Sequence, residues 1–180
     1  MSISRLINGL NSNLYDIEFI SINRPKIKDK IKKKIKYRIF NSKRTLTIMY
    51  KIKKYLNEDN KYKKKIFISN QNFANTLSIF FLRGIKNLKI ILFERNHLDE
   101  LSYFKGFKDF LKKKIIKILI KLLYRKADLV ITNSIESSKK LSDYSNINVR
   151  TLYNPSFFGF RASIKKNKIQ NKKLNILNVA

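Results

Sequence analysis

The side chains that could bind or react with a substrate are concentrated in three short polar runs. The first run contains Asn70 and Gln71, the second contains Arg95, Asn96 and His97, and the third contains Asn133 and Ser134. Amide, hydroxyl and imidazole groups exchange hydrogen bonds with substrate hydroxyls, and a guanidinium binds phosphate through two parallel hydrogen bonds. These residue types are therefore typical of a site for a hydroxylated or phosphorylated ligand.

Several kinds of catalysis are excluded by residues that are missing. The 180 residues include no cysteine and one histidine, which rules out thiol chemistry and metal sites that need two imidazoles. We therefore expect neither a metal nor another cofactor. Asp99 and Glu100 are adjacent and would point about 100° apart on a helix, which does not suit the facing carboxylates of a glycoside hydrolase. The sequence also has no P-loop and no complete dinucleotide-binding glycine motif.

Apolar periodicity predicts strands and helices that follow one another along the chain. Strands are predicted over residues 17–22, 35–40, 66–69, 88–93, 129–132, 148–152 and 173–179, and helices over residues 2–10, 45–56, 73–82, 103–125 and 134–141. This order favours right-handed crossovers and an α/β, Rossmann-like parallel sheet with helices on both faces. Each polar run follows a predicted strand, and ligands bind beyond the carboxyl ends of such strands. The three runs should therefore meet at one edge of the sheet.

The end of the chain differs from the rest. Residues 1–155 are predicted to form the Rossmann-like domain, whereas residues 156–170 are rich in lysine and have no clear apolar period. Residues 173–179 then predict one more strand. That strand would be either an edge strand of the same sheet or the first strand of a missing second domain.

The chain is strongly basic, with 41 basic and 12 acidic side chains and a formal charge of +29. Lysine accounts for 32 of the basic residues and arginine for 9. A charge of this size attracts polyanions and anionic lipid. No apolar run approaches the roughly 18 residues of a membrane-spanning helix. We therefore expect a cytoplasmic protein that is either soluble or peripheral at the inner face of the membrane.

The predicted helix over residues 103–125 is cationic and amphipathic. Lysines recur along one side of it, and apolar residues occupy much of the rest. A helix that covers a parallel sheet has the same pattern, with its lysines in solvent. The alternative is attachment in the plane of an anionic membrane. The candidate membrane contacts are Lys108, Lys112, Lys117 and Lys121.

Several segments form an ordered set that spans the chain. Near the end lie Ala127–Ser134 (ADLVITNS), then Ser137, Lys139 and Leu141, then Val149–Pro155 (VRTLYNP). Upstream lie two polar strand ends, Asn70–Asn75 (NQNFAN) and Leu92–His97 (LFERNH). This set resembles the N-terminal domain of family 4 glycosyltransferases of the GT-B fold. Relatives open with a strand and a glycine-rich loop, whereas here Met1 already lies in the predicted first helix.

The resemblance implies a reaction. The chain would be the acceptor-side half of an enzyme of polysaccharide biosynthesis that transfers a sugar from a nucleotide-sugar donor to a glycan or lipid-linked acceptor, without a metal. The domain would lack its first strand, and the C-terminal donor domain would be absent, so this chain alone is expected to be inactive. In relatives a histidine at a strand end contacts the donor sugar. His97 is therefore the candidate catalytic residue.

Two of the candidates also have a purely structural explanation that the sequence leaves open. His97 could be a solvated histidine of a loop between a strand and a helix. Arg95 could form an ion pair with Glu94 or Asp99 instead of binding a phosphate.

Residues near helix starts have a further alternative. Asn133 and Ser134 could reach an acceptor hydroxyl, or they could form a helix N-cap in which Glu136 closes a capping box. Asn70 and Gln71 have the same ambiguity, because they also precede a predicted helix.

A basic nucleic-acid-binding module is the alternative from a second class of function. Its candidate contacts are the lysine clusters at residues 30–36, 61–65 and 112–114, with Tyr37, Tyr50 and Tyr62 nearby. Lysines would bind phosphates and tyrosines would stack on bases. The scarcity of arginine and the absence of a known nucleic-acid-binding motif argue against this class. We therefore expect no specific nucleic acid partner.

Overall fold

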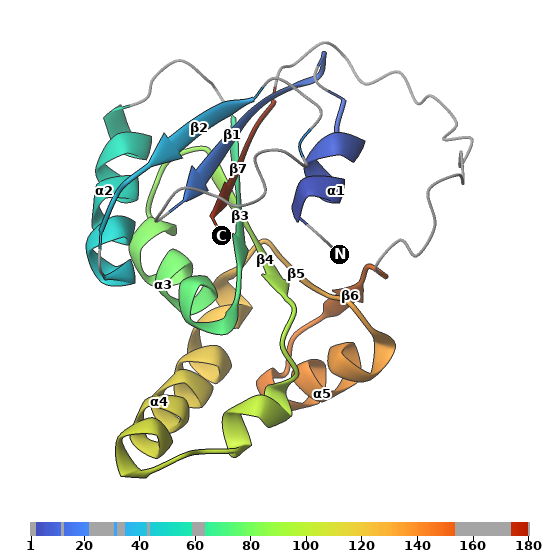
Figure 1. The fold of residues 1–180 in the computed structure, drawn as a ribbon. Coiled ribbons are helices and arrows are strands. Elements are labelled where there is room, and N and C mark those ends of the chain that lie inside the picture. Colours follow the sequence, from blue (N-terminus) through green and yellow to red (C-terminus); the bar gives the residue numbers. More distant parts are fainter. Residues whose placement is uncertain are drawn as a thin grey trace.

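Strands that pair in parallel form one open sheet in the computed structural model (Figure 1). The structure describes residues 3–11, 13–21, 31, 35–42, 44–58, 64–153 and 174–179. Within these residues the strands are β1 (Tyr15–Ser21), β2 (Lys36–Ile39), β3 (Lys65–Asn70), β4 (Leu88–Glu94), β5 (Leu129–Thr132), β6 (Val149–Thr151) and β7 (Leu174–Val179). Their order across the sheet is β2-β1-β7-β3-β4-β5-β6, and every neighbouring pair is parallel. The predicted α/β, Rossmann-like class is confirmed.

Helices cover both faces of this sheet. They are α1 (Ile3–Gly9), α2 (Thr45–Glu58), α3 (Asn72–Leu82), α4 (Phe107–Leu123) and α5 (Ile135–Ser145), with short 3₁₀ segments η2 (Leu98–Ser102) and η3 (Tyr124–Lys126). Residues of α2, α3, α4 and α5 share one large apolar cluster on one face. On the other face, α1 packs against Ile17, Phe19, Ile68 and Phe93. Successive strand residues point to opposite faces, so strands covered on both sides are apolar at consecutive positions.

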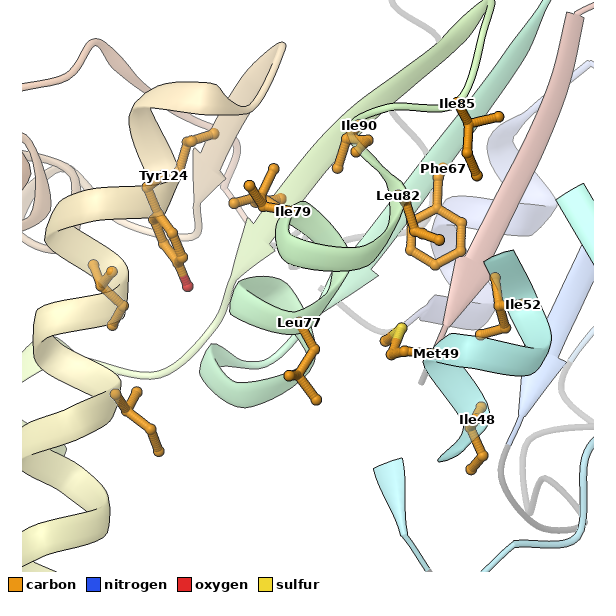
Figure 2. Packing of buried hydrophobic residues seen from close by; sticks show 14 of the residues in the cluster. Ile48, Met49, Ile52, Phe67, Leu77, Ile79, Leu82, Ile85, Ile90 and Tyr124 are labelled. Carbon is orange, nitrogen blue, oxygen red and sulfur yellow. The ribbon is translucent and has the colours of Figure 1, made fainter. Parts of the chain in front are cut away.

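Helix α3 lies at the centre of the larger cluster. Figure 2 shows it between α2 and α4, with Leu77, Ile79 and Leu82 among the labelled side chains. Ile79 and Leu82 are almost fully buried, as is Phe67 of the adjacent strand β3. A helix surrounded in this way holds its first turn at a fixed place beside the ends of β3 and β4.

Strand β7 does not lie where the sequence suggested. It pairs with β1 on one side and β3 on the other, and is neither an edge strand nor part of a separate sheet. Strands β1 and β3 have backbone groups that need a pairing strand, and β7 supplies it to both. On one side of β7 lie β1 and then β2, and on the other side lie β3 to β6, each group in chain order from the centre outward. The direction in which successive strands are added therefore reverses at β7. Such a reversal marks the point where α/β sheets bind ligands.

The helix predicted over residues 103–125 is shorter in the structure. It begins after Gly106 and ends at Leu123, because Tyr103 has extended backbone angles and residues 124–126 form a 3₁₀ turn. The Asp109 carboxylate accepts a hydrogen bond of 3.1 Å from the Lys105 backbone N–H and so holds the preceding loop. Among the described residues, no helix has the length and apolar character needed to cross a membrane. The predicted loop at 156–170 lies outside the described residues.

Candidate active site

The polar runs that follow β3, β4 and β5 meet at one edge of the sheet, as predicted. Asn70 pairs in register with Phe93, and Glu94 pairs with Thr132, so the carboxyl ends of the three strands lie side by side. A narrow recess opens there. Its polar lining consists of Asn72, Glu94, Asn96, Thr132 and Ser137, and its apolar lining consists of Leu98, Ile120 and Leu141.

The centre of this edge is the carboxylate of Glu94, which is only 4% exposed. The Tyr124 hydroxyl donates to Glu94 Oε2 at 2.6 Å, and the Asn75 amide donates to the same oxygen at 3.1 Å. The Asn72 side chain faces both carboxylate oxygens in the orientation in which its amide nitrogen donates to them. The backbone N–H groups of Arg95 and Asn96 also favour the ionised carboxylate and lower its pKa. The bonds from Tyr124 and Asn75 hold Glu94 at the start of the loop that carries His97.

All of these donors to Glu94 are electrically neutral. None of them supplies a positive charge to offset the cost of burying the ionised carboxylate. Burial raises the pKa of the Glu94 carboxyl from its ordinary 4.5 to about 7, while the hydrogen bonds from Tyr124, Asn75 and the loop backbone oppose the rise. Burial and the nearby Glu94 carboxylate also raise the pKa of the Tyr124 hydroxyl. A carboxyl that titrates near neutrality inside a recess is a common mark of a functional site.

His97 lies at the rim of the recess, half-buried, and is held by α5. Its Nδ1 lies 3.1 Å from Ser137 Oγ, and Ser134 Oγ donates to Ser137 Oγ at 2.9 Å. Ser137 Oγ can donate to His97 Nδ1 while it accepts from Ser134, and in that tautomer the imidazole proton lies on Nε2. Within the described part of the chain, Nε2 has no hydrogen-bond partner, and it can donate to a ligand oxygen.

Two other predicted residues of the same loop lie in solvent. Asn96 is exposed and lines the recess, whereas Arg95 is exposed beside it. The alternative ion pair of Arg95 is wrong for both proposed partners: the Asp99 carboxylate accepts from Lys140 Nζ at 2.6 Å, and Glu94 is bound by the neutral donors. Lys140 lowers the pKa of Asp99 and ties this loop to α5.

The predicted capping box at the start of α5 is also wrong. Ser134, not Asn133, is the N-cap, and its Oγ accepts from the Ser137 backbone N–H at 3.2 Å. Glu136 instead pairs with Lys140 at 3.1 Å, one turn later. The third helical position is therefore Ser137, whose hydroxyl is left to bind His97. Asn133 is half-buried beside the cap.

At the end of β3, Asn70 is buried, whereas Gln71 is exposed and precedes α3. Gln71 has φ 83° and ψ 141°, a backbone conformation that favours glycine, and its side chain makes no capping bond to the helix. Strain of this kind is concentrated at binding and catalytic sites.

No protein-family model, curated protein or solved structure matches this chain. Within the described ranges, no three histidine, cysteine, aspartate or glutamate side chains converge in a way that could hold a metal ion.

The residue types in the sequence did not indicate the buried part of the recess. Glu94 is predicted only as a member of the polar run after its strand and as a partner of Arg95, and Asn75 and Ser137 only as members of the segments that resemble the family. One signal was present: Asn72 and Asn75 lie three residues apart on a mostly apolar helix, where polar side chains need buried partners. A glutamate that ends a strongly apolar strand is a suitable partner for them.

Proposed function

We propose that this chain is the N-terminal, acceptor-side domain of a family 4-like GT-B glycosyltransferase. The complete enzyme would transfer a sugar from a nucleotide-sugar donor to a hydroxyl of a surface glycan or lipid-linked acceptor. The observation that carries the proposal is an imidazole that contacts Ser137 at a recess lined by the buried carboxyl of Glu94, at the carboxyl edge of a parallel sheet. The motifs that resemble the family end or begin at this same edge.

His97 would contact the sugar in this function. In the tautomer in which Nδ1 accepts from Ser137, the Nε2–H group would donate one hydrogen bond to a sugar hydroxyl or to a developing charge on the leaving group. Asn96, at the recess, would bind a second hydroxyl, and the exposed Arg95 would meet a phosphate. Glu94 would act as a positioning residue, because its bonds to Asn75 and Tyr124 fix the end of β4, where the loop that carries all three begins.

The remaining parts of the reaction follow from the family resemblance. The donor domain would bind the nucleotide and stabilise it as a leaving group with protein cations and helix N-termini, so no metal would be required. This domain would then supply the acceptor site and one contact to the donor sugar. Nucleotide sugars are a cytoplasmic substrate class, and the enzyme would work in the cytoplasm at the inner face of the membrane.

The test uses the fact that His97 is the only histidine. Its ring signals in an NMR spectrum need no assignment by mutation. We expect these signals to shift on titration with UDP-glucose, UDP-N-acetylglucosamine or GDP-mannose at high concentration, and to shift less with UDP or GDP alone. The pure chain should release no nucleotide from these donors, because the donor-binding half is in the other domain.

Nucleic acid provides the comparison ligand. Duplex DNA should bind weakly and without sequence preference, and the binding should fall steeply with salt because it depends on counterion release. It should leave the His97 signals unchanged. The proposal is overturned by turnover of a nucleotide sugar by the pure chain, or by His97 signals that respond to DNA and to no nucleotide sugar.

A further inference from the structure

Helix α4 has two apolar faces where a helix that only covers a sheet needs one. Ile116 and Ile120 are buried in the core. The opposite side carries a stripe of exposed apolar residues that recur every three or four positions along the helix. The stripe consists of Phe107, which is 79% exposed, and Leu111, Ile115, Ile118 and Leu122, each 48% exposed. Packing against the core explains the face with Ile116 and Ile120, but it does not explain the exposed apolar stripe.

Lysines lie on both sides of the stripe. At about 100° per residue, Lys108 and Lys112 fall on one flank, and Lys117 and Lys121 fall on the other. The expectation that these lysines share one side of the helix is therefore wrong, because the exposed apolar stripe separates them. Lys112 Nζ lies 6.0 Å from the centre of the Phe73 ring, and Lys117 Nζ donates to Ser102 Oγ at 2.8 Å. Lys108 and Lys121 are exposed.

The loop before α4 extends the stripe with aromatic side chains. Tyr103 is 76% exposed and Phe104 is 55% exposed. Phe104 stacks edge-on against Phe110 with ring centres 5.0 Å apart, and Lys113 Nζ donates to the Tyr103 carbonyl oxygen. The loop is thus attached to the helix while its aromatic rings remain in solvent.

We propose that the stripe and the aromatic loop form a docking surface for an anionic lipid bilayer, with α4 lying in the plane of the membrane. Apolar side chains would enter the boundary of the acyl chains while lysines on both flanks meet lipid phosphates. Tyrosine and phenylalanine at one end suit the interfacial region. The inference rests on α4 and its loop and is independent of the proposed glycosyl transfer.

Charge and side-chain type favour a bilayer over two other occupants. A second copy of the chain seated on the stripe would bring the flanking lysines of both copies together, within molecules that each carry a formal charge of +29. A nucleic acid would meet the lysines and the exposed aromatic rings, but it would leave Leu111, Ile115, Ile118 and Leu122 in contact with water. An anionic bilayer satisfies the lysines and the aliphatic side chains together.

The test places a tryptophan in the stripe, since the chain has none. In Phe107→Trp we expect a blue shift of tryptophan emission with vesicles of phosphatidylcholine containing about 30% phosphatidylglycerol, and little change with phosphatidylcholine alone. Phe80→Trp is the matched control, because Phe80 is 70% exposed and belongs to α3, whereas the stripe belongs to α4. Its emission should not shift with either vesicle.

Affinity measurements by vesicle flotation separate specific docking from general adhesion. Leu111→Ser combined with Ile115→Ser and Ile118→Ser should weaken binding roughly tenfold or more. Replacing Lys108, Lys112 and Lys121 by glutamine should weaken binding more than replacing Lys51, Lys53 and Lys139, which are exposed on α2 and α5. Circular dichroism checks that each variant is folded.

Three results would overturn the proposal. The first is equal weakening by the two lysine sets with no effect of the serine substitutions, which indicates general adhesion. The second is a blue shift of Phe107→Trp that grows with protein concentration in the absence of vesicles, which indicates a second copy. The third is the same shift with single-stranded RNA.

Discussion

Two buried or partly buried glutamates of this protein each accept a hydrogen bond from a tyrosine, but their surroundings differ. Glu94 Oε2 accepts from Tyr124 at 2.6 Å, and Glu18 Oε2 accepts from Tyr55 at 2.7 Å. Glu18, on β1, also pairs with Arg38 Nε of β2 at 2.6 Å. The Arg38 guanidinium in turn lies 3.8 Å from the centre of the Tyr55 ring. Glu94 has no cation among its partners in the part of the chain that the structure describes.

Glu18 therefore has a stabilising, structural role, whereas the ionised form of Glu94 is energetically unfavourable in the folded protein. At Glu18 a guanidinium neutralises the carboxylate and joins the two strands to α2. At Glu94 burial is balanced only by neutral donors, so the ionised form is disfavoured and the pKa rises to about 7. This carboxyl lies at the edge where the sheet presents its polar side chains.

The largest expected effect is on the pH dependence of stability. Because the folded pKa of Glu94 lies above its ordinary 4.5, the native state holds more protons between these values, and the free energy of unfolding falls as pH rises from about 4.5 to about 7. Glu94→Gln removes this titration. Relative to the wild type, its free energy of unfolding should rise by about 3 kcal/mol between pH 4 and pH 8 in urea titrations.

Glu18→Gln is the matched control for this experiment. It leaves Arg38 without its charged partner and should lower the free energy of unfolding by about 1 kcal/mol at neutral pH. A relative stability of Glu94→Gln that rises with pH, beside a loss of stability in Glu18→Gln, supports the comparison. A Glu94→Gln variant whose stability relative to the wild type does not change with pH would contradict it.

A smaller effect is expected from removing each tyrosine hydroxyl. Tyr124→Phe takes a donor from a carboxylate that has no cation, and should cost about 2 kcal/mol at pH 8, where Glu94 is ionised. Tyr55→Phe leaves Glu18 paired with Arg38 and should cost about 0.5 to 1 kcal/mol. Denaturation midpoints in urea at pH 8 and pH 5 measure both. Equal losses at pH 8 would mean that the missing cation makes no difference.

Much of the fold could be predicted because it depends on local periodicity. The consecutive apolar residues of β3, β4 and β5 indicated strands covered on both faces, and the polar residue after each strand indicated the shared edge. The place of β7 could not be predicted in the same way. Its residues 174–179 indicate a strand, but only long-range pairing decides that this strand lies between β1 and β3.

The sequence predicted residues at the rim of the recess but not the hydrogen-bonded group at its centre. His97, Asn96 and Ser134 stood out because reactive or polar types follow strands. Glu94 and Tyr124 come from elements 30 residues apart, and their contact depends on how α4 and η3 pack on the sheet. The role of Ser137 depended on which residue caps α5, a shift of one position that the sequence pattern left open.

The smallest expected effect concerns backbone strain at Gln71, on the same edge as Glu94. A non-glycine residue at φ 83° and ψ 141° costs of order 1 to 3 kcal/mol, whereas glycine adopts these angles freely. Glycine also increases the conformational entropy of the unfolded chain, which offsets part of the stability gained by removing the strain. We therefore expect Gln71→Gly to raise the free energy of unfolding by about 1 kcal/mol.

Asn146→Gly is the control for this substitution. Asn146 ends α5 at φ 51° and ψ 54°, a left-handed conformation that asparagine tolerates, and its replacement should change stability by only a few tenths of a kcal/mol, roughly. A gain confined to Gln71→Gly would locate a second destabilising feature at the carboxyl edge of β3 and β4. If both variants behave alike, Gln71 carries no special strain, and the cost at this edge belongs to Glu94 alone.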